Sequence, residues 1–464
     1  MAMPSYLTFK SRRSEPVLVG PAKPTPHEIK LLSDIDDQEG IRFYRSGIHI
    51  YRSHPSKVGQ DPAKIIKAAL ADVLVYYYPI AGRIREESGR KLVVECNGEG
   101  IVFVEADVDV SVDDFGDVIS PPIPCYQELL CEPDSASAVV VDRPLLYIQV
   151  TRLSCGGFVF GLQLCHNIAD AAGVVQLLKA IAELARGAEA PSVQPVWARE
   201  LLCARSPPRV THQHPEYEEV TRRGKEVIRA GDAGLIHRAF FFGPKEMSTL
   251  RQRAPPQIRC SRFDLLAAFV WRCRTVALGY DPCDEVRIQF VVNARGRRNP
   301  PLPVGFYGNA FAFAVASTTA GELCGRPYSY ALEQVMKAKA KVTDEFLQSV
   351  ADLMVVRGRP RFTTAQTYLV SDLTRAGFEE VDFGWGEGVY GGAATANLAT
   401  FHIKSKNGRG EEGIGLPMCL PAPAMERFAL EIASLTEETT FDRQSPTPVL
   451  DNHSATYLIS QLSN

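Results

Sequence analysis

The stretch Leu164-Cys165-His166-Asn167-Ile168-Ala169-Asp170-Ala171-Ala172-Gly173 lies where a strand-like pattern ends and a helical pattern begins. Before it, apolar and polar residues alternate in two segments, 146–151 and 158–165, and the small residues of 154–157 between them suit a tight hairpin. After it, apolar residues recur at helical spacing as far as Leu184. The pattern predicts two paired strands, followed by a helix that begins near the end of the stretch.

His166 and Asp170 are the residues of this stretch that can carry out chemistry. His166 is expected to leave the end of the strand, and a neutral imidazole takes up a proton near physiological pH. Asp170 is expected near the helix N-terminus, where a carboxylate is electrostatically favoured and can fix the turn. The pattern His-x-x-x-Asp therefore predicts a catalytic base with a supporting carboxylate. The alternative is a capping aspartate beside a histidine that has only structural contacts.

A metal site is another interpretation of the same two residues, because side chains four positions apart share one face of a helix. Such a site needs a third ligand. His212 and His214 are the candidates, and they lie in a proline-rich polar stretch with no cysteine pair nearby. We therefore expect no bound metal.

The composition is that of an ordinary globular protein of 464 residues, 45% apolar and 23% charged, which is long enough for two domains. The net charge of -3 provides no basic surface for nucleic acid or for an anionic membrane, so small organic substrates are expected. The eleven cysteines are scattered and include no Cys-x-x-Cys pair, which indicates a reduced, intracellular protein.

The two ends of the chain bear on its location. The N-terminal segment carries Lys10, Arg12 and Arg13 without the apolar run of a secretory signal, and no apolar window reaches membrane-spanning length. We therefore expect a cytoplasmic protein with no membrane partner. The tripeptide Ser460-Gln461-Leu462 is similar to a peroxisomal signal, which leaves a peroxisomal location as the alternative, although Ser463 and Asn464 follow it.

Prolines mark a break near the middle of the chain. Between about 187 and 223 the periodic patterns give way to prolines and charges, which is typical of a linker. We expect an α/β fold, mixed sheets with flanking helices, in an N-terminal domain 1–190, a linker 191–223 and a C-terminal domain 224–464. The expected strands are 91–95, 101–105, 146–151, 158–165, 237–242, 286–292, 399–404 and 414–420, and the expected helices are 62–78, 171–186, 263–278, 328–351 and 424–435.

A glycine-rich segment around Asp382-Phe383-Gly384-Trp385-Gly386 predicts a loop with unusual backbone angles. Its formal match to a dinucleotide fingerprint is weak, because no amphipathic helix follows. A kinase magnesium triplet is also excluded, since the other kinase motifs are missing from the sequence. A structural interpretation remains open, in which Asp382 pairs with an arginine and Trp385 packs the loop.

Two basic segments are candidates for binding anionic groups. Asn293-Ala294-Arg295-Gly296-Arg297-Arg298 closes a predicted strand, and its arginines can hold a carboxylate or phosphates. Ser261 and Arg262 precede a predicted helix, where phosphate binding is natural. The alternative for the first segment is a solvated basic turn.

These motifs, taken together, resemble the plant BAHD acyltransferase family. The resemblance rests on His166-x-x-x-Asp170, the Asn293 to Arg298 segment, Tyr307-Gly308-Asn309 and the Asp382 to Gly386 segment, in this order. Longer runs, including Leu31-Leu32-Ser33-Asp34-Ile35-Asp36-Asp37-Gln38 and Arg357-Gly358-Arg359-Pro360, are similar to the alcohol acyltransferase branch of that family and extend the resemblance through nearly the whole chain.

The resemblance implies two chloramphenicol acetyltransferase-like domains with a solvent channel between them. It implies an enzyme that forms esters from acyl-CoA and a small alcohol, with acyl-CoA as a co-substrate, no tightly bound cofactor and a single-chain, monomeric protein. Benzoyl-CoA and benzyl alcohol are the implied substrates, with anthraniloyl-CoA or acetyl-CoA as alternative donors. A noncatalytic acyl-CoA-binding relative and a hydrolase that uses water as acceptor are the rival functions.

The resemblance also implies roles for individual residues. His166 becomes the general base that takes the alcohol proton, and Asp170 is expected to pair with Arg295 and fix the histidine turn. Asp382 belongs to the family's catalytic set, although we expect a structural role for its whole loop, including Gly384, Trp385 and Gly386. Ser261, Arg262, Arg297 and Arg298 are candidates for contacts with the CoA phosphates. Some family members carry a Ser-Trp pair upstream of the glycine loop, whereas here Ser371 is followed by Asp372, so that route assigns no oxyanion-stabilising group.

Overall fold

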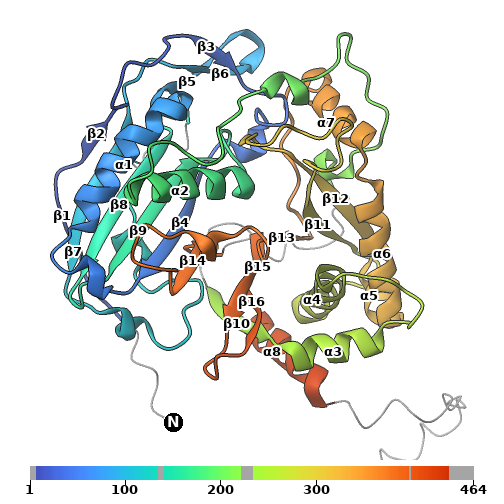
Figure 1. Ribbon diagram of the computed structural model, residues 1–464. Helices are drawn as coiled ribbons and strands as arrows, with labels where there is room; N and C mark the ends of the chain where they lie inside the picture. Colours follow the sequence, from blue (N-terminus) through green and yellow to red (C-terminus); the bar gives the residue numbers. More distant parts are fainter. Residues whose placement is uncertain (1–6, 134–139, 221–233, 397–398, 438–464) are drawn as a thin grey trace, which may run out of the picture.

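The computed structural model describes residues 7–133, 140–220, 234–396 and 399–437. The tripeptide Ser460-Gln461-Leu462 lies outside the described residues. Two large β-sheets, one of seven strands and one of six, lie in separate halves of the molecule, each with its own helices (Figure 1). Of the described helices, none is both long and apolar enough to cross a membrane.

The sheet of the N-terminal half has the strand order β1-β7-β8-β9-β4-β14, with β2 paired to β7. The predicted hairpin is present: β8 and β9 pair antiparallel, and Gly156 turns the chain with a positive φ of 79°. Helices α1 and α2 pack together on one face of this sheet (Figure 1). The bounds are β1 Arg12–Arg13, β2 Val17–Val19, β4 Tyr44–Tyr51, β7 Ile101–Val108, β8 Leu146–Leu153, β9 Phe158–Cys165, α1 Pro62–Tyr76 and α2 Ala171–Ala185, beside a small sheet of β3 Ile29–Leu31, β5 Arg83–Glu86 and β6 Leu92–Glu95.

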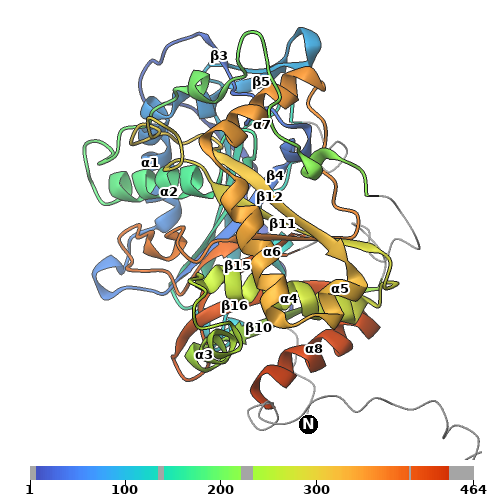
Figure 2. The ribbon, with the colours of Figure 1, turned by 90° about the vertical axis from the view of Figure 1, so that its right-hand side faces the viewer.

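The sheet of the C-terminal half has the strand order β10-β16-β15-β13-β11-β12. Helix α4 is buried along most of its length, and its apolar residues are spread around the helix instead of being confined to one stripe. Helix α6 contacts both α4 and β12 and runs across this sheet (Figure 2). The bounds are β10 Leu235–Phe242, β11 Glu285–Asn293, β12 Phe311–Thr319, β13 Thr367–Asp372, β15 Ala399–Lys406, β16 Glu412–Pro421, α3 Pro244–Arg253, α4 Arg262–Leu278, α5 Ala320–Gly325, α6 Tyr328–Lys341, α7 Asp344–Val356 and α8 Ala422–Glu437.

One strand crosses between the halves. Strand β14, Tyr390–Ala393, follows the glycine-rich loop in sequence but pairs antiparallel with β4 at the edge of the N-terminal sheet. The side chains of Phe383 and Trp385, just before it, lie in the hydrophobic core of the N-terminal half. The C-terminal part of the chain therefore completes the N-terminal sheet, and the domain bounds 1–190, 191–223 and 224–464 stay a prediction.

The single helix predicted over 328–351 was wrong, because the structure has two helices there. Helix α6 ends at Lys341 and α7 begins at Asp344. Thr343 separates them as the N-cap of α7, and its hydroxyl accepts a hydrogen bond of 3.2 Å from the backbone N–H of Phe346. Strands β1, β2, β3, β4, β5, β12 and β13 and helices α3 and α5 were also missed, whereas the expected strands and the other expected helices are present, most of them with shifted ends.

Candidate active site

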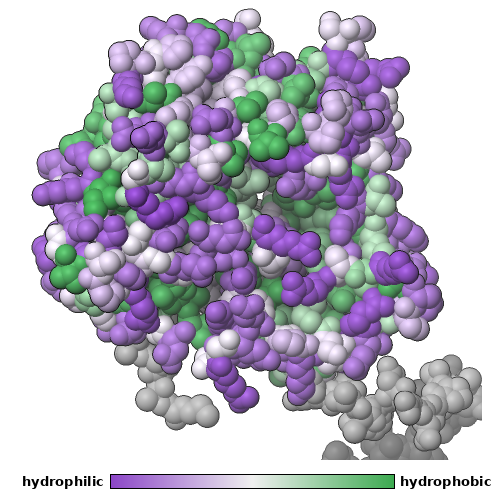
Figure 3. All heavy atoms as spheres, in the orientation of Figure 1, coloured by the Kyte–Doolittle hydropathy of each residue, from purple (hydrophilic) through white to green (hydrophobic). Residues whose placement is uncertain are grey.

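A cavity of about 590 Å³ lies between the two halves and takes its walls from both. Strands β4 and β9 and the start of α2 supply one side, while β11, β12, β13 and β15 supply the other. The space-filling view shows hydrophobic residues inside a hollow between the halves, with hydrophilic residues around it (Figure 3). The volume lies within the range of small-molecule sites.

His166 lies at the end of β9 and lines this cavity, as the sequence predicted for a strand end. Its backbone is held on both sides: the N–H donates to the carbonyl of Phe43 at 2.8 Å, and the carbonyl accepts from the amide of Asn309 at 2.7 Å. The imidazole packs edge-on against the ring of Phe43, and the ring of Phe311 lies 6.2 Å from it, centroid to centroid. Among the described residues, Nδ1 of His166 has no hydrogen-bond partner.

The electrostatic surroundings keep His166 neutral. Burial and, second, the positive charge of Arg45 lower the pKa of His166 to about 4. At neutral pH the imidazole is therefore unprotonated and able to accept a proton. This is the protonation state that a general base needs before it meets an alcohol.

Asp170 forms the predicted ion pair with Arg295. Its two carboxylate oxygens accept hydrogen bonds of 2.7 and 2.8 Å from the guanidinium. The same carboxylate caps α2 by accepting from the N–H of Gly173 at 3.1 Å, and it accepts from the N–H of Ala310 at 3.0 Å. Four donors thus converge on one carboxylate, and two of the partners, Arg295 and Ala310, belong to the opposite half. The carboxylate joins the two halves next to His166.

A buried network that sequence reasoning missed supports the same turn. Asp36 accepts two hydrogen bonds of 2.8 Å from Asn309, whose side chain also reaches the carbonyl of His166. The next residue, Asn167, donates to the carbonyl of Asp36 at 2.6 Å, and Arg199 donates to that of Ile168 at 2.8 Å. The backbone on both sides of the histidine is therefore fixed by side chains from distant parts of the sequence.

The glycine-rich loop packs on the N-terminal half and is organised by Asp382. One carboxylate oxygen accepts hydrogen bonds of 2.7 and 2.8 Å from the N–H groups of Gly384 and Gly386, both of which have positive φ. Trp385 packs against Phe158 of β9, with ring centroids 5.2 Å apart. Asp382 is not among the residues that line the cavity, so its contacts are those of a loop-forming residue.

Of the four residues predicted to contact CoA phosphates, three line the cavity and one does not. Ser261, Arg262 and Arg297 line the cavity with Lys339. The Ser261 hydroxyl is engaged as the N-cap of α4, with Asp264 as its partner. Arg298 lies outside the cavity wall, and its guanidinium donates to Asp344 at 2.7 Å and to the carbonyl of Leu201 at 2.9 Å.

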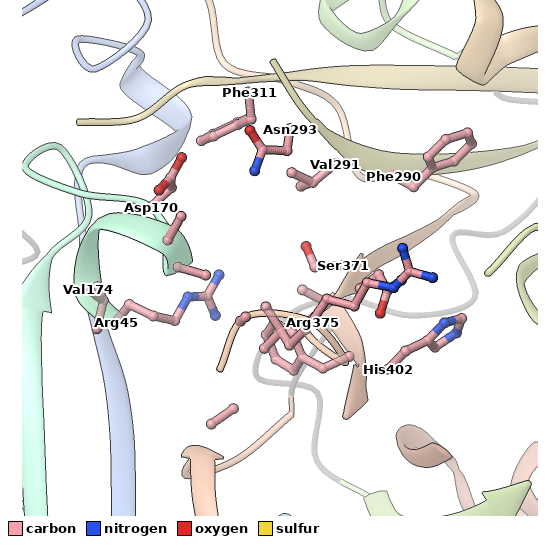
Figure 4. A pocket seen from close by; sticks show the side chains of 18 of the residues that line it. Arg45, Asp170, Val174, Phe290, Val291, Asn293, Phe311, Ser371, Arg375 and His402 are labelled. Carbon is pink, nitrogen blue, oxygen red and sulfur yellow. The ribbon is translucent and has the colours of Figure 1, made fainter. Parts of the chain in front are cut away.

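Arg45, Arg375 and His402 also line the cavity, and sequence reasoning did not single them out. Figure 4 shows Arg45 beside Asp170 and Val174, Arg375 near the middle with Ser371, and His402 on the far side. His402 is fully buried, and neither ring nitrogen has a partner among the described residues. Burial lowers the pKa of His402 to about 4. The signal for Arg45 was weak, because its strand β4 was not predicted.

The histidines considered as metal ligands have other partners. His214 is buried and contacts Glu216 at 3.0 Å and the hydroxyl of Ser349 at 2.8 Å. This Ser-His-Glu arrangement resembles a hydrolytic triad, but the Ser349 hydroxyl accepts the N–H groups of Thr211 and His212 and lies away from the cavity. These hydrogen bonds connect the segment after residue 191 to helix α7.

Comparison with known proteins gives consistent results. A model described as the Transferase family matches residues 10–435. The chain is 56% identical over 438 residues to benzyl alcohol O-benzoyltransferase of Petunia hybrida, covering 93% of this chain and 95% of that protein. It is 50% identical over 449 residues to alcohol acyl transferase 1 allele GSd of Malus domestica, covering 95% and 97%. The crystal structure of vinorine synthase matches with a TM-score of 0.71 at 22% identity, covering 92% of this chain and 98% of that one.

Proposed function

Because the chain belongs to the Transferase family of BAHD acyltransferases and is an acyl-CoA-dependent alcohol O-acyltransferase, we propose that it transfers a benzoyl group from benzoyl-CoA to benzyl alcohol. The fold is the expected mixed α/β fold of two chloramphenicol acetyltransferase-like parts. The observation that carries the proposed mechanism is the neutral His166 in the wall of a cavity between the halves.

The proposed reaction needs a base but no covalent intermediate. His166 takes the hydroxyl proton of the alcohol as its oxygen attacks the thioester carbonyl. The tetrahedral intermediate then collapses, the carbon–sulfur bond breaks, and the CoA thiolate takes the proton back from the imidazolium. The products are the ester and CoA thiol. Asp170 and Arg295 act as positioning residues, because their hydrogen bonds are used in holding the turn.

The cavity lining supports aromatic groups on both substrates. Eight phenylalanines line its walls, and their rings favour flat apolar groups through burial and ring packing. The phenylalanines that line it are Phe43, Phe263, Phe290, Phe311, Phe313, Phe362, Phe378 and Phe401. Discrimination by a few buried methylenes is worth only about 1–3 kcal/mol, so anthraniloyl and acetyl groups are expected as weaker alternative donors.

The acyl-CoA is proposed to bind with its phosphates near Arg262, Arg297 and Lys339. These three cationic side chains line one side of the cavity, and Arg262 is exposed. Phosphate oxygens pair well with guanidinium and ammonium groups. Arg298 is proposed to support this basic turn through Asp344 and not to contact the phosphates. A monomeric state and a cytoplasmic location complete the proposal.

The test is a competition between substrates. Purified enzyme is incubated with benzoyl-CoA, anthraniloyl-CoA and acetyl-CoA together and with a mixture of neutral alcohols, and the esters are identified by mass spectrometry. Benzyl benzoate is expected as the main product. A product mixture dominated by acetyl esters would contradict the proposed donor, and release of free benzoic acid with no ester would favour the hydrolase.

A further inference from the structure

Arg45 is a charged side chain within the cavity that the proposed mechanism does not use. It lies in β4, opposite Leu164 of β9, two residues before His166. Figure 4 shows its side chain extending into the cavity from the side that carries Asp170 and Val174. Its charge acts on the imidazole of His166, since it is the second cause of the lowered pKa of that histidine.

The Arg45 guanidinium has no hydrogen bond or ion pair with any residue that the structure describes, and its contacts are aromatic. It lies 4.9 Å from the ring centre of Phe43 and 5.5 Å from that of Phe401. The side chain is exposed to the solvent inside the cavity. The walls of the cavity surround it with protein. Desolvation by the surrounding protein lowers the pKa of Arg45 to about 10, so the group is still charged at neutral pH.

The nearby carboxylates accept hydrogen bonds from groups other than Arg45. Asp170 is saturated by Arg295 and backbone N–H groups. Asp372, on the opposite wall, accepts from the hydroxyl and the N–H of Thr374. The protein therefore leaves a fork of donors in an aromatic cavity for some other acceptor.

An entirely apolar substrate is a poor match for this cavity. When it binds, it displaces the water around Arg45 and leaves the charge without compensation, which is unfavourable. A carboxylate on the substrate restores the lost hydrogen bonds in bidentate geometry. The arrangement thus penalises benzyl alcohol relative to an otherwise similar alcohol that carries a carboxylate.

The acceptor, not the acyl donor, is the substrate that meets Arg45. The alcohol must contact His166, and Arg45 lies on the same side of the cavity. Arg262, which is proposed to bind CoA, lies toward the other side, because the ring of the next residue, Phe263, is 5.5 Å from that of His402, which Figure 4 shows opposite Arg45.

We propose that Arg45 determines acceptor specificity by binding a carboxylate, so that aromatic hydroxy acids are preferred to neutral benzylic alcohols. The inference rests on the proposed benzoyl transfer and specifies its acceptor. Arg45 is a binding residue in this account, and the bond-making step stays that of His166.

The test compares two acceptors that differ only in the carboxylate, benzyl alcohol and 4-(hydroxymethyl)benzoate, each with benzoyl-CoA. For the wild type, kcat/KM for the acid is expected to exceed kcat/KM for benzyl alcohol by more than about tenfold. One charge-assisted hydrogen-bonded pair provides a preference of this size. Arg45→Leu should lower the ratio of the two kcat/KM values about ten- to a hundredfold through a raised KM for the acid. Arg45→Lys should retain part of the preference, because an ammonium keeps the charge but not the fork.

The control is Arg52→Leu, which removes an exposed arginine just beyond the same strand, paired with Asp113 outside the cavity. Its acceptor ratio should equal that of the wild type. An unchanged ratio in Arg45→Leu overturns the proposal. So does an equal loss of kcat for both acceptors, which would place Arg45 at the reacting atoms, or a loss of the ratio in Arg375→Leu alone.

A binding measurement separates this proposal from the proposed function. Titration calorimetry of 4-(hydroxymethyl)benzoate into wild-type protein and Arg45→Leu requires no turnover. A loss of affinity of about tenfold or more in the variant supports the carboxylate site even if no benzoyl ester forms. Equal affinities overturn it even if the enzyme makes benzyl benzoate readily.

Discussion

Arg295 holds the carboxylate of Asp170 with two hydrogen bonds of 2.7 and 2.8 Å, and so links the start of α2 in one half to the turn after β11 in the other. The same guanidinium donates to the carbonyl of Gly308 at 2.7 Å. Asn309, the next residue, reaches the carbonyl of His166. The junction between the halves and the position of the candidate base are therefore parts of one hydrogen-bonded structure.

Removing this link should destabilise the protein. The two side chains are only 21% and 12% exposed, so Arg295→Ala leaves a mostly buried carboxylate unpaired. We expect the free energy of unfolding to fall by about 3–5 kcal/mol, measured by urea denaturation. Arg12→Ala breaks a pair of the same type with Asp109 on the exposed surface and should have no measurable effect. Equal stability of the two variants would show that the Asp170 pair is unimportant.

The activity of the enzyme should persist into acid solution. The pKa of His166 is lowered to about 4, so the base stays unprotonated well below pH 6. The acid limb of kcat/KM reports the base in the free enzyme and should lie well below pH 6.5. Arg45→Leu removes a charge that opposes protonation, which moves this limb to higher pH. A wild-type limb near pH 6.5 that Arg45→Leu leaves in place would contradict this electrostatic account.

Asp382 should prove important for folding and dispensable for the bond-making step. Asp382→Ala leaves the N–H groups of Gly384 and Gly386 without their acceptor, so we expect a lower melting temperature and less folded protein. The kcat per folded molecule, counted by active-site titration with a tight-binding ester analogue, should fall much less than in His166→Ala. A loss as large as that of His166→Ala in fully folded protein would make Asp382 catalytic.

Acid should destabilise the fold partly through His49, which lies in β4 and is 1% exposed. Burial lowers the pKa of His49 to about 3, whereas an unfolded histidine titrates near 6.5. Between these values only the unfolded state takes up the proton, so stability falls as the pH falls from 6.5, with a limiting slope of about 1.4 kcal/mol per pH unit. His49→Leu should flatten this dependence in urea titrations, whereas substitution of the exposed His54 should not. Parallel curves for wild type and His49→Leu would exclude the effect.

Local patterns were sufficient for the centre of the site. The strand end at His166 and the helix start at Asp170 follow from apolar periodicity, and the pairing of Asp170 with Arg295 followed from the family resemblance. The break between α6 and α7 also had a local signal that was overlooked, since Thr343 followed by Asp344 and Glu345 is a typical helix start.

The site residues that sequence reasoning missed are brought into place by contacts between distant parts of the chain. Arg45 reaches the cavity because β4 pairs with β9 on one side and with β14, more than 300 residues later, on the other. Asp36 supports the histidine turn through Asn309, which is 273 positions away. No window of sequence brings such residues together, so their roles emerge only from the sheet order.

The central claim is that the neutral imidazole of His166 is the base for direct acyl transfer, and the most direct measurement is ester formation by purified His166→Ala. With benzoyl-CoA and an accepted alcohol at pH 7, kcat/KM should fall by about a hundred- to ten-thousandfold while circular dichroism and CoA affinity stay those of the wild type. Near-full turnover by folded His166→Ala protein would contradict the account.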